Sequence, residues 1–249
     1  MSPLIILIAV AAFILGGGLQ RICGMGTGVV AGPILALAMG PVLGVLTTNT
    51  AAIVTAAVLT VSLRAHVDWR RVAIICVTGA IGIGIGVAVI HRVTSAWLEV
   101  VIATLLLAGL ATTSIAARPR PGRAPQFDAL GGGIGGVMNA LVGMAGPILV
   151  LDSRLTGWEQ QRFAASLQPI FLFLNIGSVL AKVVPGLPPG VDLPPWWVVP
   201  IVFASVLFGA WLGGRLAPRV SSTHARTLAI LVASAGCITL LVRGASTLL

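Results

Sequence analysis

Long stretches of the chain contain no charged residue, and this feature most restricts how the chain can fold. Ile22–Leu63 contains no Asp, Glu, Lys or Arg. A membrane-spanning helix needs about 20 apolar residues, so this run is long enough for two crossings. The other charge-free runs are Val72–Ile90, Val100–Ala117, Ala129–Leu151, Phe163–Ala181, Leu193–Gly214 and Thr227–Val242. We expect an all-α polytopic membrane protein, because a backbone inside hydrocarbon must satisfy its own hydrogen bonds.

Composition excludes the main alternatives. Charged residues make up 8% of the chain, against about 25% in a soluble domain. The apolar runs lack the alternating pattern of β-barrel strands. We assign the net charge of +9 to membrane topology, because no basic face is combined with stacking aromatics. The predicted contacts are membrane lipid and no nucleic acid, and the first apolar run is expected to be a retained span.

The two halves of the chain resemble each other. A linker rich in Pro and Arg, 118–126, separates a first repeat (1–117) from a second (127–249). Matching residues lie 119 positions apart early in the halves and 127 apart later: Gly16 with Gly135, Gly24-Met25 with Gly143-Met144, Trp69 with Trp196, and Arg92-Val93 with Arg219-Val220. We expect about eight membrane segments (range seven to nine), four in each repeat. They are 4–38, 41–63, 69–91, 95–116, 127–152, 159–183, 194–217 and 223–245.

The first segment of each half contains a glycine-rich interruption. The segment 4–38 is too long for one straight crossing, since a helix rises 1.5 Å per residue. Glycine permits non-helical backbone, and proline removes a backbone donor. The interruptions are Gly24-Met25-Gly26-Thr27-Gly28, with Gly32-Pro33 beyond it, and Gly143-Met144-Ala145-Gly146-Pro147. Both first helices are expected to break there.

Paired interruptions in two repeats predict the solute site of a transporter. A helix that restarts inside the protein offers unpaired N–H groups and the positive end of its dipole to an anion. Arg21, the one charged residue before Arg64, could hold an oxyanion through two parallel hydrogen bonds. The predicted substrate-binding residues are Gln20, Arg21, Gly24, Met25, Gly26, Thr27, Gly28, Asn49, Asn139, Gly143, Met144, Ala145, Gly146 and Gln168.

These residues also have structural interpretations. Arg21 could lie at the membrane surface between two short helices, and the amides of Gln20, Asn49, Asn139 and Gln168 could link helices instead of binding solute. Glycines of membrane helices commonly serve close packing. We predict that packing role for Gly16, Gly82, Gly84, Gly86, Gly209 and Gly213.

No catalytic site, metal site or cofactor is predicted. The histidines lack ligand spacing, no nucleophile motif is present, and Cys76 and Cys237 are expected to be buried thiols. Acidic and basic residues are assigned to the ends of the spans. Those placed in loops include Asp68, Asp128, Asp152, Arg154, Glu159, Asp192 and Arg226, with Glu99 near a helix start. Without an acid in mid-membrane to carry protons, the membrane potential alone would drive an anion out of a negative-inside cell.

The duplicated helix sets, each opening with a Gly-rich break (Gly24–Gly28 and Gly143–Gly146), resemble the TauE/SafE sulfite exporter family along nearly the whole chain. The segments Gly79–Gly82 and Gly209-Ala210, which precede Arg92 and Arg219, fit the resemblance. It implies a carrier in the bacterial inner membrane for sulfite, sulfonates such as sulfoacetate, and related organosulfur anions. The chain departs from the family's glycine-richer breaks at Thr27, Ala145 and Pro147.

Two other functions fit the sequence. One is a membrane-embedded structural or assembly subunit that carries no solute. The other is a carrier of a different small solute or of a metal ion, since Cys23 and Met25 could bind a soft metal. The absence of an acidic or thiolate cluster beside Arg21 disfavours a cation. The sequence leaves a homo-oligomer open.

Overall fold

The computed structural model describes residues 2–23, 27–112 and 124–248. Within these ranges every regular element is a helix, which confirms the all-α prediction. The first half contains α1 (Pro3–Cys23), α2 (Thr27–Met39), α3 (Pro41–Leu63), the 3₁₀ turn η1 (Arg64–His66), α4 (Trp69–Arg92) and α5 (Ser95–Thr112). The second contains α6 (Ala124–Val142), α7 (Gly146–Thr156), α8 (Gln160–Val183), α9 (Val198–Leu216) and α10 (Ser222–Leu248).

Six helices are long and apolar enough to cross a membrane: α1, α3, α4, α8, α9 and α10. The helices α2 and α5 are shorter and also apolar. Large apolar side chains such as Leu7, Ile81 and Leu231 point outward and are more than half exposed, as expected of a surface in contact with lipid. The polytopic membrane architecture is therefore confirmed, while the count of about eight spans stays a prediction.

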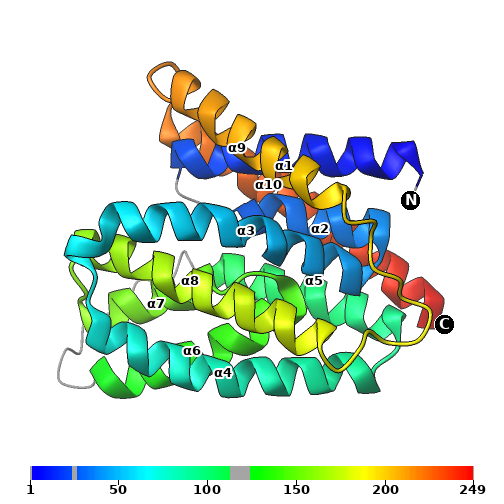
Figure 1. Ribbon diagram of the computed structural model, residues 1–249, viewed down its shortest axis with the longest axis horizontal. Coiled ribbons are helices and arrows are strands. Elements are labelled where there is room, and N and C mark those ends of the chain that lie inside the picture. The colour runs from blue at the N-terminus through cyan, green and yellow to red at the C-terminus, as the bar shows by residue number, and fades with distance from the viewer. Residues whose placement is uncertain (1, 24–26, 113–123, 249) are drawn as a thin grey trace.

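The first segment of each half is interrupted where the sequence predicts. One helix ends at Cys23 and the next starts at Thr27; in the second half the ends are Val142 and Gly146. The helices on either side of the first interruption are antiparallel, and Figure 1 shows α2 running back beside α1. A Cβ added at Gly16 would lie 2.9 Å from the Thr27 methyl carbon, although a straight helix would separate these residues by about 16 Å. The segment 4–38 is thus two antiparallel helices and not one bent crossing.

The second half folds back in the same way. Gly131 lies against Asp152, and Gly135 lies against Ala145 and Ile148, so α7 returns along α6. The turn contains Gly143, whose φ of +75° lies in the left-handed region that favours glycine. With only 11 residues, α7 is about 16 Å long and ends far short of a full crossing.

Two helix pairs, α1 with α9 and α4 with α6, pack backbone against backbone. Gly209 and Gly213 lie on the carbonyls of Ile14 and Gly18, and a Cβ at either position would come closer than 3 Å to them. At the matching positions of the other pair, Gly82 lies on the carbonyl of Gly133, and Gly86 approaches Val137. The packing role predicted for Gly82, Gly86, Gly209 and Gly213 is confirmed. It is wrong for Gly84, where an added Cβ would meet no atom of another described helix within 4 Å.

Glycine-to-alanine substitutions should distinguish the closely packed glycines from Gly84. Gly82→Ala and Gly209→Ala are each expected to destabilise the fold by about 1–3 kcal/mol, because the added methyl meets backbone that cannot move aside. Gly84→Ala, at an open position of the same helix, should be neutral or slightly stabilising. Melting temperatures of the purified variants in detergent test this. Equal values for Gly82→Ala and Gly84→Ala would contradict the close contact.

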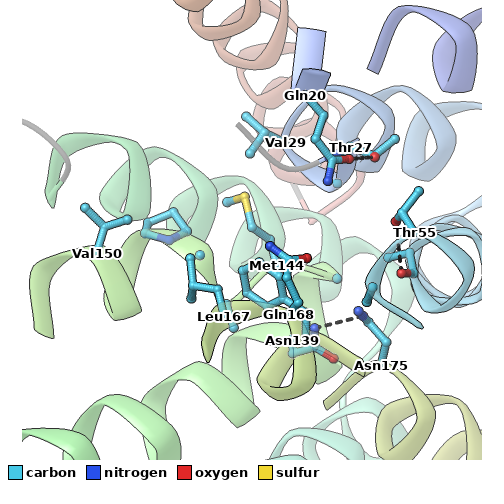
Figure 2. Close-up of a pocket in the computed structure, with 18 of the residues that line it drawn as sticks. Gln20, Thr27, Val29, Thr55, Asn139, Met144, Val150, Leu167, Gln168 and Asn175 are labelled. Atoms are coloured by element: carbon cyan, nitrogen blue, oxygen red, sulfur yellow. Dashed lines mark hydrogen bonds between the residues drawn. The ribbon is translucent and has the colours of Figure 1, made fainter. Parts of the chain in front are cut away.

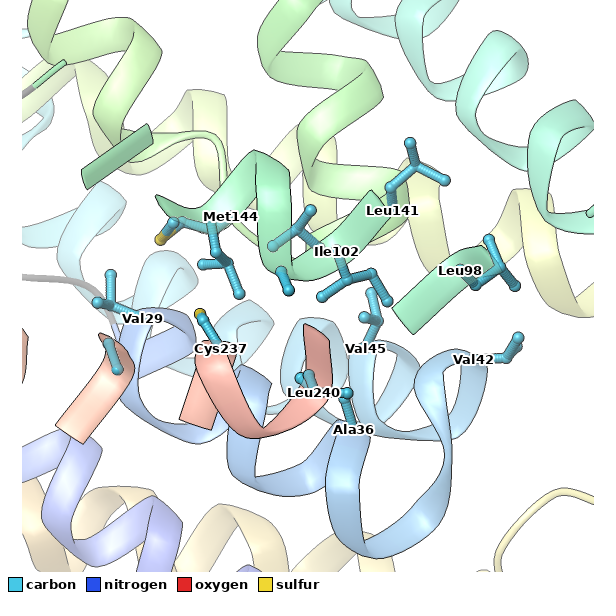
Figure 3. Packing of buried hydrophobic residues seen from close by; sticks show 14 of the residues in the cluster. Val29, Ala36, Val42, Val45, Leu98, Ile102, Leu141, Met144, Cys237 and Leu240 are labelled. Atoms are coloured by element: carbon cyan, nitrogen blue, oxygen red, sulfur yellow. The ribbon is translucent and has the colours of Figure 1, made fainter. Parts of the chain in front are cut away.

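The core between α2, α5 and the helices around them is apolar. Figure 3 shows Val29 of α2, Val45 of α3, Ile102 of α5, Met144 and Cys237 of α10 converging there. Cys237 is fully buried, and Cys76 is buried in a second cluster, as predicted. This core holds the turn at Gly143–Ala145 against α2, α3 and α10.

Candidate functional site

The start of α2 meets the turn that follows α6. A Cβ at Gly28 would lie 2.8 Å from the Gly143 carbonyl oxygen, so the start of α2 touches the end of α6. The middle of α3 covers both: the Thr48 methyl lies near Gly28, and the Asn49 amide oxygen lies near Gly143. Residues remote in sequence are thereby brought to one place, as the prediction of a shared site requires.

A cavity of about 360 Å³ opens beside this meeting point. Its lining comes from the facing ends of α1 and α2, from α6 and the turn that follows it, and from α3, α7, α8 and α10, as Figure 2 shows in part. The polar lining residues are Gln20, Thr27, Thr55, Asn139, Ser153, Arg154, Gln160, Gln168, Asn175 and Arg226. The apolar wall includes Val150, Phe163, Leu167 and Phe171. No acidic side chain is among the described residues that line the cavity.

Most of the predicted site residues that the structure describes do line this cavity: Gln20, Thr27, Gly28, Asn139, Gly143, Met144, Ala145, Gly146 and Gln168. Gly24, Met25 and Gly26 were also predicted, and they lie outside the described residues. Asn49 is fully buried behind the lining and bonds to other helices. The Gln168 amide, while lining the cavity, donates to the Ala164 carbonyl of its own helix.

Arg21 is not among the described residues that line the cavity, and its role in substrate binding stays a prediction. Its side chain is exposed and packs on Gly214 of α9. Gly17 and Gly18, which face α9, precede Arg21 by about one helical turn and therefore share its side of α1. The neighbouring Gln20 lies on the α2 side, where its Oε1 accepts hydrogen bonds from the Thr27 N–H, at 3.1 Å, and from the Thr27 hydroxyl.

The helix α7 points its N-terminal end at the cavity. Gly146 and Pro147 line it, and Ala145, at the cap position, provides no side-chain cap. The first N–H groups of this helix are therefore available to an anion, and the helix dipole favours negative charge there. The start of α2 differs, because the amide of Gln20 already accepts from its first N–H.

Two arginines in the cavity wall were assigned to loops by the sequence analysis. Arg154 lies on α7 and Arg226 on the first turns of α10. The spacing Gly146, Val150, Arg154 places all three on one face of a helix, which is a signal that could have identified Arg154. Arg226 has no local signal, because only the packing of α10 against α1 and α2 brings it to the site.

Buried amides connect the cavity to Lys182 of α8, a third basic residue after Arg154 and Arg226. Asn139 Nδ2 donates to Asn175 Oδ1 at 3.1 Å, and Asn49 Nδ2 donates to the Ser178 hydroxyl at 2.8 Å. That hydroxyl also accepts from Lys182 Nζ at 3.0 Å, and Lys182 is 2% exposed. The amides thus link helices, as the structural interpretation allowed, and Asn139 and Asn175 line the cavity as well. The Lys182 amine lies buried behind them.

Asp128 and Asp152, also assigned to loops, are buried inside helices, so that assignment was wrong for both. Asp128 is 1% exposed on α6 and Asp152 is 3% exposed on α7. Arg71 of α4 supplies one positive charge beside them: its Nε lies 2.8 Å from Asp128 Oδ2, and its guanidinium packs on the Trp158 ring. Burial is possible because the partner cation is supplied by another helix. Glu99, near the start of α5 as predicted, is paired with Arg243 of α10.

Comparison with known proteins gives one match. The family model described as "Sulfite exporter TauE/SafE" matches residues 8–240. No curated protein and no solved structure gives a significant match.

Proposed function

Since the chain belongs to the TauE/SafE sulfite exporter family, which implies a membrane transporter of sulfur anions, we propose that it is a secondary carrier that exports sulfite or a small organosulfonate such as sulfoacetate. The single observation that carries this proposal is the charge of the cavity. Arg154 and Arg226 are its charged lining residues in the described part of the chain, and an uncapped helix start faces them. A site of this kind stabilises a small oxyanion.

The shape of the cavity supports a substrate with an organic part. Arg154 lies on the same face of α7 as the helix start, about two turns further along, and Phe163, Leu167 and Phe171 of α8 form an apolar wall. A sulfonate group could accept hydrogen bonds from Arg154 or the start of α7, while a short carbon chain contacts the apolar wall. Small-molecule sites commonly combine a few polar groups with such an apolar wall.

The pairing of helices supports an origin by duplication, which is part of the same proposal. The glycine contacts of α9 with α1 recur at matching positions between α4 and α6. The two helix turns recur likewise and face each other. A pair of interrupted helices at the interface of two repeats is where many secondary carriers bind substrate.

Flux measurements in liposomes test the proposal. Protein reconstituted at neutral pH is expected to release preloaded radiolabelled sulfite or sulfoacetate, and the same anions should raise its melting temperature by mass action. The absence of flux and of stabilisation for every small oxyanion tested, with the fold intact, would favour a structural subunit. Stabilisation by a soft metal ion instead would favour the metal carrier suggested by Cys23 and Met25.

A further inference from the structure

Asp152 is a buried carboxylate without a hydrogen-bond donor. Its side chain is 2% exposed, and neither carboxylate oxygen has a hydrogen-bond partner among the residues that the structure describes. Arg71 Nη2 is 3.7 Å from Asp152 Oδ2, too far for a hydrogen bond. The donors of Arg71 are directed to Asp128 and to the Thr156 hydroxyl.

The charges of this cluster do not balance. Arg71 contributes one positive charge, whereas Asp128 and Asp152 contribute two negative charges when both are ionised. The carboxyl groups of these two acids lie side by side. Other charged groups nearby point elsewhere: Arg154 of α7 lines the cavity, and Glu159 pairs with Arg162 at the exposed start of α8. A single proton on Asp152 would supply the missing donor and neutralise the cluster.

The cluster lies directly behind the cavity. Asp152 immediately precedes Ser153 and Arg154, which line the cavity, so one short helix carries both the anion-facing side chains and the unpartnered acid. An anion in the cavity and an ionised Asp152 repel each other. Protonation of Asp152 removes that repulsion, and by reciprocity the bound anion favours the protonated acid.

We propose that Asp152, shielded by Arg71 and Asp128, is the proton-binding site that couples anion movement to the pH gradient; this inference rests on the proposed function. The carboxylate takes up one proton from water on the side where the anion enters and returns it on the other side. One proton and one monovalent anion, such as hydrogensulfite, cross together, so the net movement is electroneutral; a divalent anion such as sulfoacetate would carry one negative charge across with the proton. Export then runs down the outward anion gradient and is opposed by a pH gradient that is acidic outside, and the membrane potential alone does not drive transport of a monovalent anion.

Methanesulfonate is the appropriate probe, because it is a monovalent sulfonate that stays ionised near neutral pH. Proteoliposomes containing the full chain are given either an acidic exterior with the potential clamped at zero, or a potassium diffusion potential at equal pH. The acidic exterior should drive accumulation of labelled methanesulfonate, and the potential alone should not. Accumulation driven by the potential alone, or by a sodium gradient, would overturn the coupling while leaving the carrier function intact. If no condition gives flux, including exchange of internal for external methanesulfonate, both the carrier function and the inference are overturned.

Substitution assigns the coupling to Asp152. Asp152→Asn is permanently neutral, so its methanesulfonate movement should lose the response to the pH gradient and become driven by the potential. Glu159→Gln removes an exposed acid and should behave as the wild type does. A pH response retained in Asp152→Asn, or a folded variant that carries no anion, would contradict the assignment, because asparagine resembles the protonated acid in charge and shape.

A chemical measurement on the wild type covers the case in which Asp152→Asn fails to fold. Dicyclohexylcarbodiimide is an apolar reagent that attacks protonated carboxyl groups. It should modify Asp152, as read by peptide mass spectrometry, and methanesulfonate should accelerate the modification by about 5-fold or more, in line with typical coupling between sites. A modification rate indifferent to the anion would overturn the proposal.

Discussion

Replacing both Arg154 and Arg226 by alanine is expected to abolish anion flux, and each single substitution should weaken the apparent affinity about 10- to 100-fold. Both side chains line the cavity, and a hydrogen bond to a charged group contributes roughly 1.5–3 kcal/mol. Flux of labelled sulfite or sulfoacetate in liposomes, measured over a range of concentrations, gives the affinity. The melting temperature without solute should change little in Arg226→Ala, because the effect is on binding.

Arg21→Ala is the matched control, since it removes an arginine that lies outside the cavity. It should leave the apparent affinity within about twofold of the wild type. The reverse pattern, with a large loss in Arg21→Ala and none in Arg154→Ala, would favour the site predicted from the sequence over the one found in the structure. The two hypotheses about the anion-binding arginine are therefore separated by one pair of variants.

Arg71→Ala should cause the largest loss of stability among single substitutions of charged residues, about 3–5 kcal/mol. The substitution leaves Asp128 and Asp152 buried without a cation, and removing one partner of a buried ion pair is far more costly than removing both. The double variant Arg71→Ala with Asp128→Asn should recover part of the loss. Melting temperatures in detergent measure both.

Arg162→Ala provides the comparison at an exposed ion pair. Arg162 and Glu159 are each 63% exposed, and such pairs contribute about 0–1 kcal/mol. Equal melting temperatures for Arg71→Ala and Arg162→Ala would show that Arg71 does not stabilise the packing of α4 against α6 and α7.

The positions of the helices and of their interruptions could be predicted because both depend on local chemistry. Charge-free runs mark what can lie in hydrocarbon, and Gly and Pro act on the backbone of their own segment. Whether an interruption is a kink or a hairpin depends on packing between helices, as in the contact of Gly135 with Ile148. That information is absent from the local pattern.

The side chains that face the cavity were harder to predict for two reasons. Gln20 and Arg21 are adjacent in sequence, yet one faces α2 and the other α9, because successive helix residues point about 100° apart. Asp128 was assigned to a loop on the rule that charges avoid the membrane. Its partner Arg71 is 57 residues away, and no short motif connects them.

The backbone contacts of α1 with α9 and of α4 with α6 restrict how the protein can change shape. In each pair the glycines of one helix contact the backbone carbonyls of the other, so rotation or sliding would cause steric collision. We expect each pair to move as one rigid body. The interface of α3 with α8, by contrast, is bridged by side chains such as Asn49 and Ser178, which can change rotamer without moving a backbone. If the protein exposes an anion alternately to the two faces of the bilayer, we expect the movement to occur at the interface of α3 with α8.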